Sequence, residues 1–406
     1  MLTPRPYQIE GRDFLAGRTR ALLADEMRVG KSCQAVMAAI AIKAERIIIV
    51  CPAIAVEHWH QEWRKWGESL GLAMLPRLCV ISYDKMRRDW ELIRQQSWDL
   101  AIVDECHFAK SPEAQRTKLV YGKGGLGWIA ARMWCLSGTP MPNHPGELWP
   151  MLKAFGVVGM DYQQFIERYC IYDKWADKIR GTKETMIPEL RSLLATVMLR
   201  RTRKDVAPEM PAIDFQFLEI TPTTAADLPA GIDTEHLEED NPTSLQAERI
   251  AVAQSKVLPL AKNIDFAISN DLLKQTVVFG WHTEPLEHLT RLLNSLNIKT
   301  ELLTGKTTPT QRERIQNDFR KGLTKIICGN IMACGTAIDL SSASHGWFIE
   351  LDWVGANNLQ AANRLVSLQK KESVTFDIAT SPGSIDDGVQ RSLLRKMQGL
   401  RGMKLA

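Results

Sequence analysis

LLADEMRVGKSCQAV, residues 22–36, decides the fold of the first half of this 406-residue chain. The stretch ends like a phosphate-binding loop, because Gly30-Lys31-Ser32 follows an apolar run and precedes a helical one. Residues 21–25 predict the strand, and residues 31–44 the helix, that such a loop connects with its amides facing the phosphates. Asp25 stands where the usual pattern opens with glycine, so the tripeptide alone is a weak signal.

The composition is that of a globular protein of two ordinary domains, with 45% hydrophobic and 24% charged residues and a net charge of +4. That charge does not by itself indicate nucleic-acid binding, although a balanced total can hide a basic face. The eight cysteines include no C-x-x-C pair, which disfavours a structural metal site. With no apolar signal core and no membrane-length apolar run, we expect a soluble cytoplasmic protein of a bacterial or phage-infected cell, or a nuclear one in a eukaryote.

Short β-rich apolar runs alternate with helical stretches through most of the chain, which predicts the α/β class with mainly parallel sheets flanked by helices. The runs are 21–25, 46–52, 78–83, 100–105 and 133–138 in the first half, and 276–281, 299–305, 325–330, 347–351 and 374–379 in the second. The helical stretch 284–296 places Leu286, Leu289, Leu293 and Leu296 on one side. Ligands of such sheets bind beyond the carboxyl ends of the strands.

The predicted domains are a first lobe over 1–220, with a helical elaboration at about 151–210, and a second lobe over 245–406. Between them, residues 221–244 are rich in threonine, proline and acidic residues and lack apolar periodicity. This composition is typical of a linker or a mobile insertion.

A second motif, WDLAIVDECH (98–107), strengthens the nucleotide hypothesis. An apolar strand ending in adjacent acids suits metal-assisted phosphoryl transfer, in which Asp104 positions Mg²⁺ and Glu105 orients the attacking water. An isolated acidic pair is more commonly a solvated strand end, but here it follows the strand-GKS motif by about 75 residues in the same lobe. We therefore expect ATP and Mg²⁺ as cofactors, with Lys31 on the phosphates and Ser32 on the metal.

The series of motifs resembles the Swi/Snf-type superfamily two DNA-dependent ATPases, which are helicase-like translocases. The resemblance covers nearly the whole chain and is nearest a minimal annealing-helicase (HARP-like) or phage or bacterial form. The first-half motifs are 4–11, 22–32, 47–63, 81–86, 103–118, 136–149 and 198–211, and the second-half motifs are 277–289, 302–319, 333–345, 349–364 and 384–397.

The resemblance implies two tandem RecA-like lobes with the ATP cleft between them, and a monomer that couples ATP hydrolysis to movement along double-stranded or forked DNA. Fork remodelling, strand annealing or protein displacement would be the outcome. The implied catalytic residues are Lys31, Asp104, Glu105, Gln360 and Arg364, and Ser32 and Asp104 would hold the metal. The implied nucleotide contacts are Arg5, Tyr7, Gln8 as the base reader, Met27, Arg28, Val29, Gly30, Lys31, Ser32, Gly335 and Asp339.

The resemblance also implies a nucleic-acid track that contacts mainly phosphates. Its residues would be Pro52, Trp59, Ser82, Tyr83, Asn143, His282, Gly305, Lys306 and Asn330. The helical spacing of Trp59, Trp63 and Trp66 favours a core-facing stripe over a stacking platform. The basic run 200–204 fits a solvated face, a contact to the other lobe or a DNA contact, and His107 is expected to couple the metal site to Ser137–Thr139.

Two departures from the family pattern bear on activity. Arg28 stands where most members have glycine, at a crowded turn. In the last motif Asn363 replaces an acid and Ser367 replaces the second arginine, so hydrolysis would rest on Arg364 alone, or borrow Lys370 or Lys371. Two alternatives therefore stay open: a nucleotide-switched DNA-binding module with weak hydrolysis, and a DExH-type RNA or DNA helicase.

Overall fold

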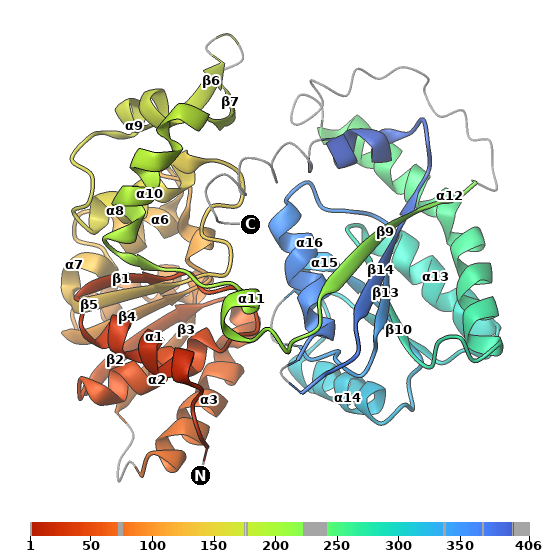
Figure 1. Cartoon of the computed structure of the whole chain (residues 1–406), viewed down its shortest axis with the longest axis horizontal. Coiled ribbons are helices and arrows are strands. Elements are labelled where there is room, and N and C mark those ends of the chain that lie inside the picture. The colour runs from red at the N-terminus through yellow and green to blue at the C-terminus, as the bar shows by residue number, and fades with distance from the viewer. Residues whose placement is uncertain are drawn as a thin grey trace. The chain divides into compact units, whose positions relative to one another are not determined.

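The chain divides into two compact units in a computed structural model that describes residues 2–71, 76–173, 175, 178–221, 242–335, 338–367, 369–391 and 393 (Figure 1). The first unit ends at Pro208 and the second begins at Glu209, so the expected lobe boundary at residue 220 moves to 208. Most of the expected linker 221–244 lies outside the described residues. Among the described helices, none is long and apolar enough to cross a membrane.

The first unit is built on a six-stranded parallel sheet in the order β3-β2-β4-β5-β1-β8. The strands are β1 (Arg20–Leu23), β2 (Arg46–Cys51), β3 (Arg77–Ser82), β4 (Trp98–Asp104), β5 (Ala130–Leu136) and β8 (Met198–Leu199). All five strands expected in this half are confirmed. The near-continuous burial of β2, β4 and β5 agrees with the apolar runs that predicted them, because both faces of a parallel sheet are covered.

Two hydrophobic cores form on the opposite faces of this sheet, since successive side chains of a strand point to opposite sides. One core lies beneath α1 (Pro6–Ala16), α2 (Lys31–Ala41) and α3 (Val56–Ser69). It contains Trp59, Trp63 and Trp66, which confirms the core-facing stripe. The other core is covered by α4 (Tyr83–Arg88), α5 (Trp90–Ile93), α6 (Gln115–Tyr121), α7 (Leu126–Ile129), α8 (Trp149–Ala154), α9 (Tyr162–Tyr169) and α10 (Ile187–Ala195).

The elaboration at 151–210 is only partly helical, which corrects the expectation. Besides α8, α9, α10 and the short α11 (Arg203–Val206), it contains an antiparallel hairpin of β6 (Cys170–Asp173) and β7 (Lys178–Thr182) (Figure 1). It also contains β8, which pairs with β1 at the edge of the main sheet. The β-branched and aromatic side chains of Ile171, Tyr172 and Ile179 favour the extended conformation in the hairpin.

The second unit holds another six-stranded parallel sheet, in the order β11-β12-β10-β13-β14-β9. Its strands are β9 (Ile213–Glu219), β10 (Thr276–Gly280), β11 (Thr300–Leu303), β12 (Ile326–Asn330), β13 (His345–Phe348) and β14 (Val374–Thr380). The five strands expected in this half are confirmed. Strand β9 was not expected, and it belongs to this sheet although it precedes residue 220.

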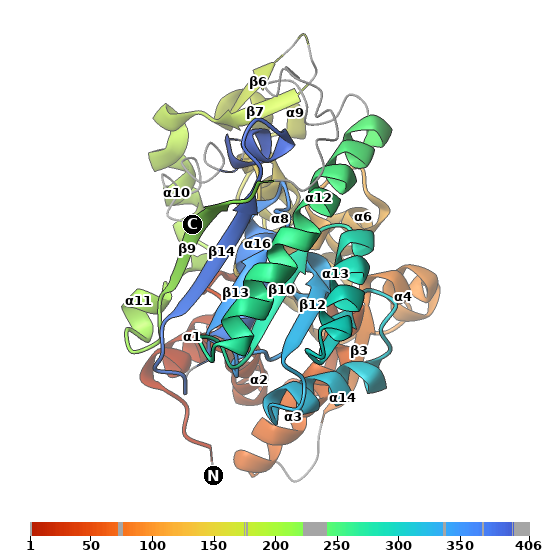
Figure 2. The same cartoon turned by 90° about the vertical axis from the view of Figure 1, so that its right-hand side faces the viewer.

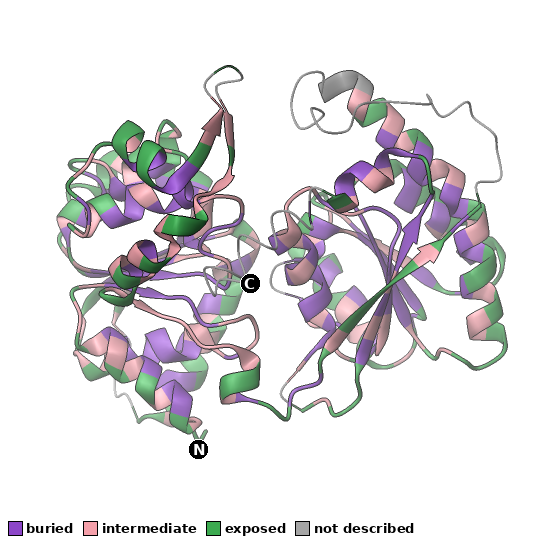
Figure 3. Cartoon of the chain, turned by 45° about the horizontal axis from the view of Figure 1, so that its top comes forward, coloured by how far each residue is buried: buried purple, intermediate pink, exposed green. Residues whose placement is uncertain are grey.

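Helices α12 (Pro242–Ser269) and α13 (Thr283–Ser295) pack their apolar residues on one face of the second sheet. Leu286, Leu289 and Leu293 of α13 are buried, but Leu296 follows the end of the helix and is 42% exposed. Helices α15 (Ile331–Cys334) and α16 (Gly355–Ala362) lie on the other side of the sheet in Figures 1 and 2, and α14 (Pro309–Arg320) connects β11 to β12. Figure 3 shows the buried strands at the centre of each unit.

Candidate nucleotide site

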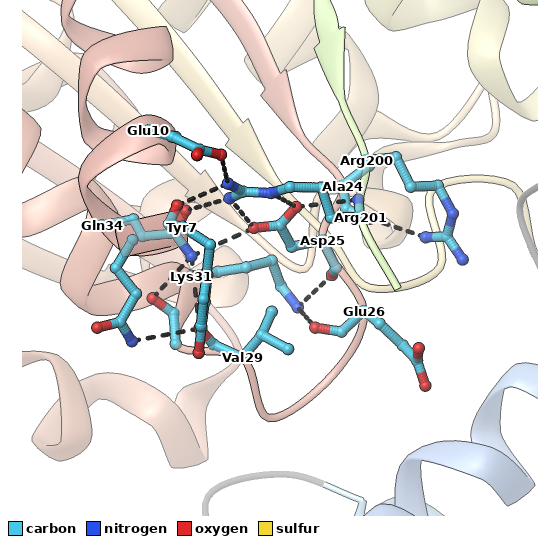
Figure 4. Close-up of polar contacts among 12 residues, drawn as sticks. Tyr7, Glu10, Ala24, Asp25, Glu26, Val29, Lys31, Gln34, Arg200 and Arg201 are labelled. Carbon is cyan, nitrogen blue, oxygen red and sulfur yellow. Dashed lines mark hydrogen bonds and ion pairs between the residues drawn. The ribbon is translucent and has the colours of Figure 1, made fainter. Parts of the chain in front are cut away.

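The phosphate loop runs from the end of β1 to the start of α2. Gly30 precedes the helix with φ +82°, and a Cβ there would lie 2.7 Å from Nε2 of Gln8, so the position requires glycine. Arg28 is also left-handed, with φ 68°, a conformation that most residues avoid. Lys31 begins α2, and its Nζ donates to the carbonyl oxygens of Asp25 (2.8 Å) and Glu26 (3.2 Å) (Figure 4). The lysine thus lies across the mouth of the turn.

Asp25 is held by an arginine 176 residues later in the chain (Figure 4). The fully buried carboxylate receives Nε of Arg201 at 3.1 Å and Nη2 at 2.6 Å, a bidentate pair. The same guanidinium donates to the carbonyl of Tyr7 (2.6 Å) and to Oε1 of Gln34 (2.9 Å). The acid in place of the family's glycine therefore anchors the loop to α1, α2 and the segment after β8.

The basic run 200–204 is largely engaged within the first unit. Arg200 donates to the carbonyls of Ala24 (2.7 Å) and Gly138 (3.1 Å), and Arg203 pairs with Glu26 at 2.8 Å. With Arg201 bound to Asp25, three of the four cations contact the loop or its surroundings. These three side chains therefore do not form a freely solvated face, Lys204 is the exposed cation of the four, and a DNA contact by the run stays a prediction.

Gln8, the expected base reader, lies against the loop. It is 7% exposed, its Nε2 donates to the carbonyl of Val29 (3.4 Å), and its Oε1 accepts from the amide of Arg5 (2.9 Å). Tyr7 packs beside it beneath the guanidinium of Arg201, whose carbon lies 5.6 Å from the ring centroid. The structure brings the expected adenine-side residues together at one side of the phosphate loop, and their contact with a base remains a prediction.

The acidic pair, Asp104 and Glu105, lies where β4 ends. Asp104 Oδ1 accepts from the amide of Glu105 (3.0 Å), and Glu105 adopts a left-handed conformation with φ 47°. Burial and the neighbouring Glu105 raise the pKa of Asp104 to about 6, whereas Lys31 acts in the opposite direction. Burial lowers the pKa of Lys31, against the opposing fields of Glu105, Asp25 and Asp104. The loop cation and the acidic pair therefore influence each other's pKa.

Two residues expected on the nucleic-acid track support this pair instead. Trp59 is 0% exposed, and its Nε1 donates to Asp104 Oδ2 at 2.8 Å. Tyr83 is 6% exposed, and its hydroxyl donates to the carbonyls of Asp104 (2.8 Å) and Glu105 (3.3 Å). Because both side chains are buried and directed at β4, the prediction that they contact DNA is wrong.

The expected coupling of His107 to residues 137–139 is present. Its Nδ1 lies 2.9 Å from Oγ of Ser137, which accepts from the amide of Thr139 at 3.1 Å. Burial lowers the pKa of His107 to about 4, so the ring is neutral at pH 7. Between these residues, a Cβ on Gly138 would lie 2.8 Å from Cγ of Met27. The turn after β5 thus touches both His107, which closely follows the acidic pair, and the phosphate loop.

The chemistry of this donor set fits a Mg²⁺–nucleotide. Lys31 offers an ammonium to phosphate oxygens, while the Ser32 hydroxyl and the Asp104 carboxylate are the hard oxygen ligands that Mg²⁺ prefers. Mg²⁺ held here would neutralise charge on the transferring phosphoryl group. Glu105 would then be placed to orient a water molecule and accept its proton on a carboxylate oxygen, a role that stays a prediction.

In the second unit, Gly335, Gln360 and Arg364 come together. Arg364 donates to the carbonyl oxygen of Gly335 from Nε, at 3.0 Å, and from Nη2. Gln360 is on another side of the same glycine, because a Cβ on Gly335 would lie 3.4 Å from its Oε1. Asp339, another expected nucleotide contact, accepts from the amide of Ser341 at 3.2 Å. Lys370 donates to the carbonyls of Ser341 and Ala343, so it is engaged inside this unit and Lys371 is the exposed one of the two lysines.

Expected nucleic-acid contacts of the second unit follow the carboxyl ends of adjacent strands. Asn330 ends β12, donates to the carbonyl of Trp281 (2.9 Å) and accepts from Thr283 (3.2 Å). His282 follows β10 and is oriented by Glu350, a residue that sequence reasoning missed, through Nδ1 at 2.8 Å and the main-chain amide at 3.0 Å. Gly305 and Lys306 are exposed after β11.

The expected track residues of the first unit that are not fully buried also follow its strands. Pro52 follows β2 and Ser82 ends β3, where its Oγ caps α4 by accepting from the amide of Lys85 (3.1 Å). Asn143 lies after β5 and donates from its main-chain amide and Nδ2 to Glu147, both at 2.8 Å. A DNA contact by these three residues stays a prediction.

Known protein families match both halves of the chain. The model of the SNF2-related domain matches residues 7–225, more than half of the chain. The chain belongs to the SNF2-related family. The helicase conserved C-terminal domain matches residues 259–368 of this SNF2-related chain, within the second unit.

Relatives of this SNF2-related chain include the DNA annealing helicase and endonuclease ZRANB3 of Mus musculus, 27% identical over 97% of the chain and 40% of the relative. The SWI/SNF-related matrix-associated actin-dependent regulator of chromatin subfamily A-like protein 1 homolog of Caenorhabditis elegans is 23% identical over 99% and 62%. The chain thus spans about 40% of the length of the mouse relative. The Sulfolobus solfataricus SWI2/SNF2 ATPase core in complex with dsDNA has a TM-score of 0.45 at 19% identity, so the family assignment rests on the sequence models.

Proposed function

We propose that this SNF2-related chain is an ATP-hydrolysing motor that moves along double-stranded or forked DNA and thereby remodels forks, anneals strands or displaces bound proteins. The observation that carries the proposal is the convergence of Lys31 and the acidic pair at one edge of the first sheet, within each other's electrostatic field. One relative is a DNA annealing helicase and another is a homolog of a regulator of chromatin, which supports DNA as the partner. Movement along a duplex needs contacts to the backbone more than to bases.

A DNA-stimulated ATPase assay tests this function. At low salt, where phosphate contacts are strongest, duplex DNA is expected to raise turnover of the purified chain well above its basal rate. Lys31→Ala is expected to abolish both rates, because it removes the cation that binds the phosphates. If duplex or forked DNA leaves ATP turnover unchanged, the proposed motor function is wrong. If single-stranded RNA stimulates turnover more strongly than duplex DNA, an RNA-directed helicase is favoured instead.

A second candidate is a nucleotide-switched DNA-binding module with weak hydrolysis. It is favoured by Ser367, which replaces an arginine of the last family motif, and by Lys370, whose ammonium is taken up by two carbonyls. An arginine finger contributes roughly 10³ to 10⁵ in rate. The switch hypothesis predicts that the unaltered chain binds ATP and DNA but turns over ATP no faster than Lys31→Ala. It also predicts that Ser367→Arg raises turnover by orders of magnitude. These two results together would favour the switch over the motor.

A further inference from the structure

The indole of Trp59 makes a single polar contact within the described part of the chain, and that contact is to the carboxylate expected to hold Mg²⁺. We propose that Trp59 is a positioning residue for the metal-binding carboxylate of Asp104. The inference rests on the proposed ATPase function of the site. It replaces the expected role of Trp59 in contacting DNA, which its complete burial rules out.

The geometry fixes both oxygens of the Asp104 carboxylate. Oδ2 accepts from the indole of Trp59 at 2.8 Å, and Oδ1 accepts from the amide of Glu105 at 3.0 Å. Trp59 lies in α3, which follows β2, the strand that neighbours β4 in the sheet. A rigid donor on a packed helix therefore sets the orientation of a side chain that ends the adjacent strand. Carboxylates that bind metals are usually held by such second hydrogen bonds.

Trp63 shows that a tryptophan can be buried in this helix without a hydrogen bond from its indole N–H. It lies one turn after Trp59 in α3, is 1% exposed, and its Nε1 has no hydrogen-bond partner among the described residues. Both indoles fill the same core beneath the first sheet. The two residues thus share helix, burial and volume, and differ in the contact to Asp104. Trp63 is therefore a matched control for every effect of packing.

The test compares Trp59→Phe, Trp63→Phe and Trp59→His in the full chain. The measured quantities are Mn²⁺ affinity of the ADP complex, by electron paramagnetic resonance, and ADP affinity in EDTA. Trp59→Phe is expected to weaken Mn²⁺ binding by roughly 10-fold or more and to leave ADP affinity in EDTA unchanged, because the loss falls on the metal ligand. Trp59→His is expected to recover most of the Mn²⁺ affinity, since imidazole Nε2 occupies the ring position of indole Nε1.

Equal Mn²⁺ affinities for Trp59→Phe and Trp63→Phe overturn the positioning role, as does a Trp59→His variant no better than Trp59→Phe. If Trp59→Phe does not fold, Trp59→Met takes its place, because it also lacks a donor and its flexible side chain fills irregular space. The assay involves neither DNA nor turnover. A chain that binds Mn²⁺·ADP but is not stimulated by DNA leaves the inference intact and refutes the motor, whereas a chain without metal-dependent nucleotide affinity refutes both.

Discussion

Replacing Arg201 with alanine should destabilise the first unit far more than its position in a basic run suggests. The change leaves the carboxylate of Asp25, 0% exposed, without the guanidinium that binds it through two hydrogen bonds. Removing one partner of a buried pair costs about 3–5 kcal/mol, because the remaining charge is desolvated and uncompensated. For a unit of about 200 residues, each kcal/mol lowers the melting temperature by roughly 2–4 °C, so a fall of roughly 6–20 °C is expected.

Arg168 provides the matched control, because it makes the same bidentate geometry at the surface. It binds Glu189 at 2.7 and 2.8 Å with side chains 48% and 39% exposed. Exposed pairs contribute about 0–1 kcal/mol, so Arg168→Ala should barely change the melting temperature measured by calorimetry. The double variant Asp25→Asn with Arg201→Met should regain much of the stability lost in Arg201→Ala, since no buried charge remains. Equal effects of Arg201→Ala and Arg168→Ala would refute the reasoning.

Three further changes probe the nucleotide site and its support. Gly138→Ala should weaken ATP binding, because the new methyl would lie 2.8 Å from the side chain of Met27 in the phosphate loop; fluorescent-ATP titration measures it. Tyr83→Phe should slow turnover more than it weakens ATP binding, because it leaves the carbonyls of the acidic pair without their hydroxyl donor and costs roughly 1–3 kcal/mol; steady-state kinetics separate the two effects. Lys110→Met should reverse the way in which Glu147 makes the stability of the fold depend on pH. Burial alone would raise the pKa of that carboxyl, but Lys110, 2.6 Å away, helps hold it below its ordinary value. In the unaltered chain, the stabilisation by this pair is therefore lost only as the pH falls through that lowered pKa. In the variant, the free energy of unfolding, measured with denaturant, should increase as the pH falls from 7 to 5.

Each of these changes has a control variant or an outcome that would contradict its reasoning. Gly159 has open space around its Cβ position, so Gly159→Ala should leave ATP affinity unchanged. An unaltered kcat in Tyr83→Phe would contradict the support of the acidic pair. In Lys110→Met, adding Glu147→Gln should remove the pH dependence, and persistence of that dependence would assign it to another group.

The fold was predictable because the strands of a parallel sheet are buried on both faces and appear as apolar runs. All ten expected strands are present, and α3 buries its three tryptophans as their helical spacing predicted. Strand β9 was missed because it lies at an edge and is poorly covered. Phe215 and Phe217 are 38% and 57% exposed, so the strand lacks the continuous burial of a central strand such as β10. The hairpin β6–β7 is equally short of burial.

The candidate site was predictable where its residues are adjacent in sequence and unpredictable where they meet through tertiary structure. Lys31 and the acidic pair follow predicted strands, so their proximity could be inferred from the carboxyl edge of the sheet. The partner of Asp25 is separated from it by 176 residues, and no periodicity indicates which cation of a basic run turns inward. Helical spacing placed Trp59 in the core, but it could not show that its N–H meets a carboxylate.

The position of β9 has a practical consequence for separating the two halves. Strand β9 pairs with β14 over seven residues, from Ile213 opposite Val374 to Glu219 opposite Thr380. A recombinant fragment beginning at residue 221 would leave the main chain of β14 as an open edge, which invites pairing between copies and aggregation. A fragment beginning at Glu209 keeps that edge covered and is the better starting material for isolating the C-terminal half.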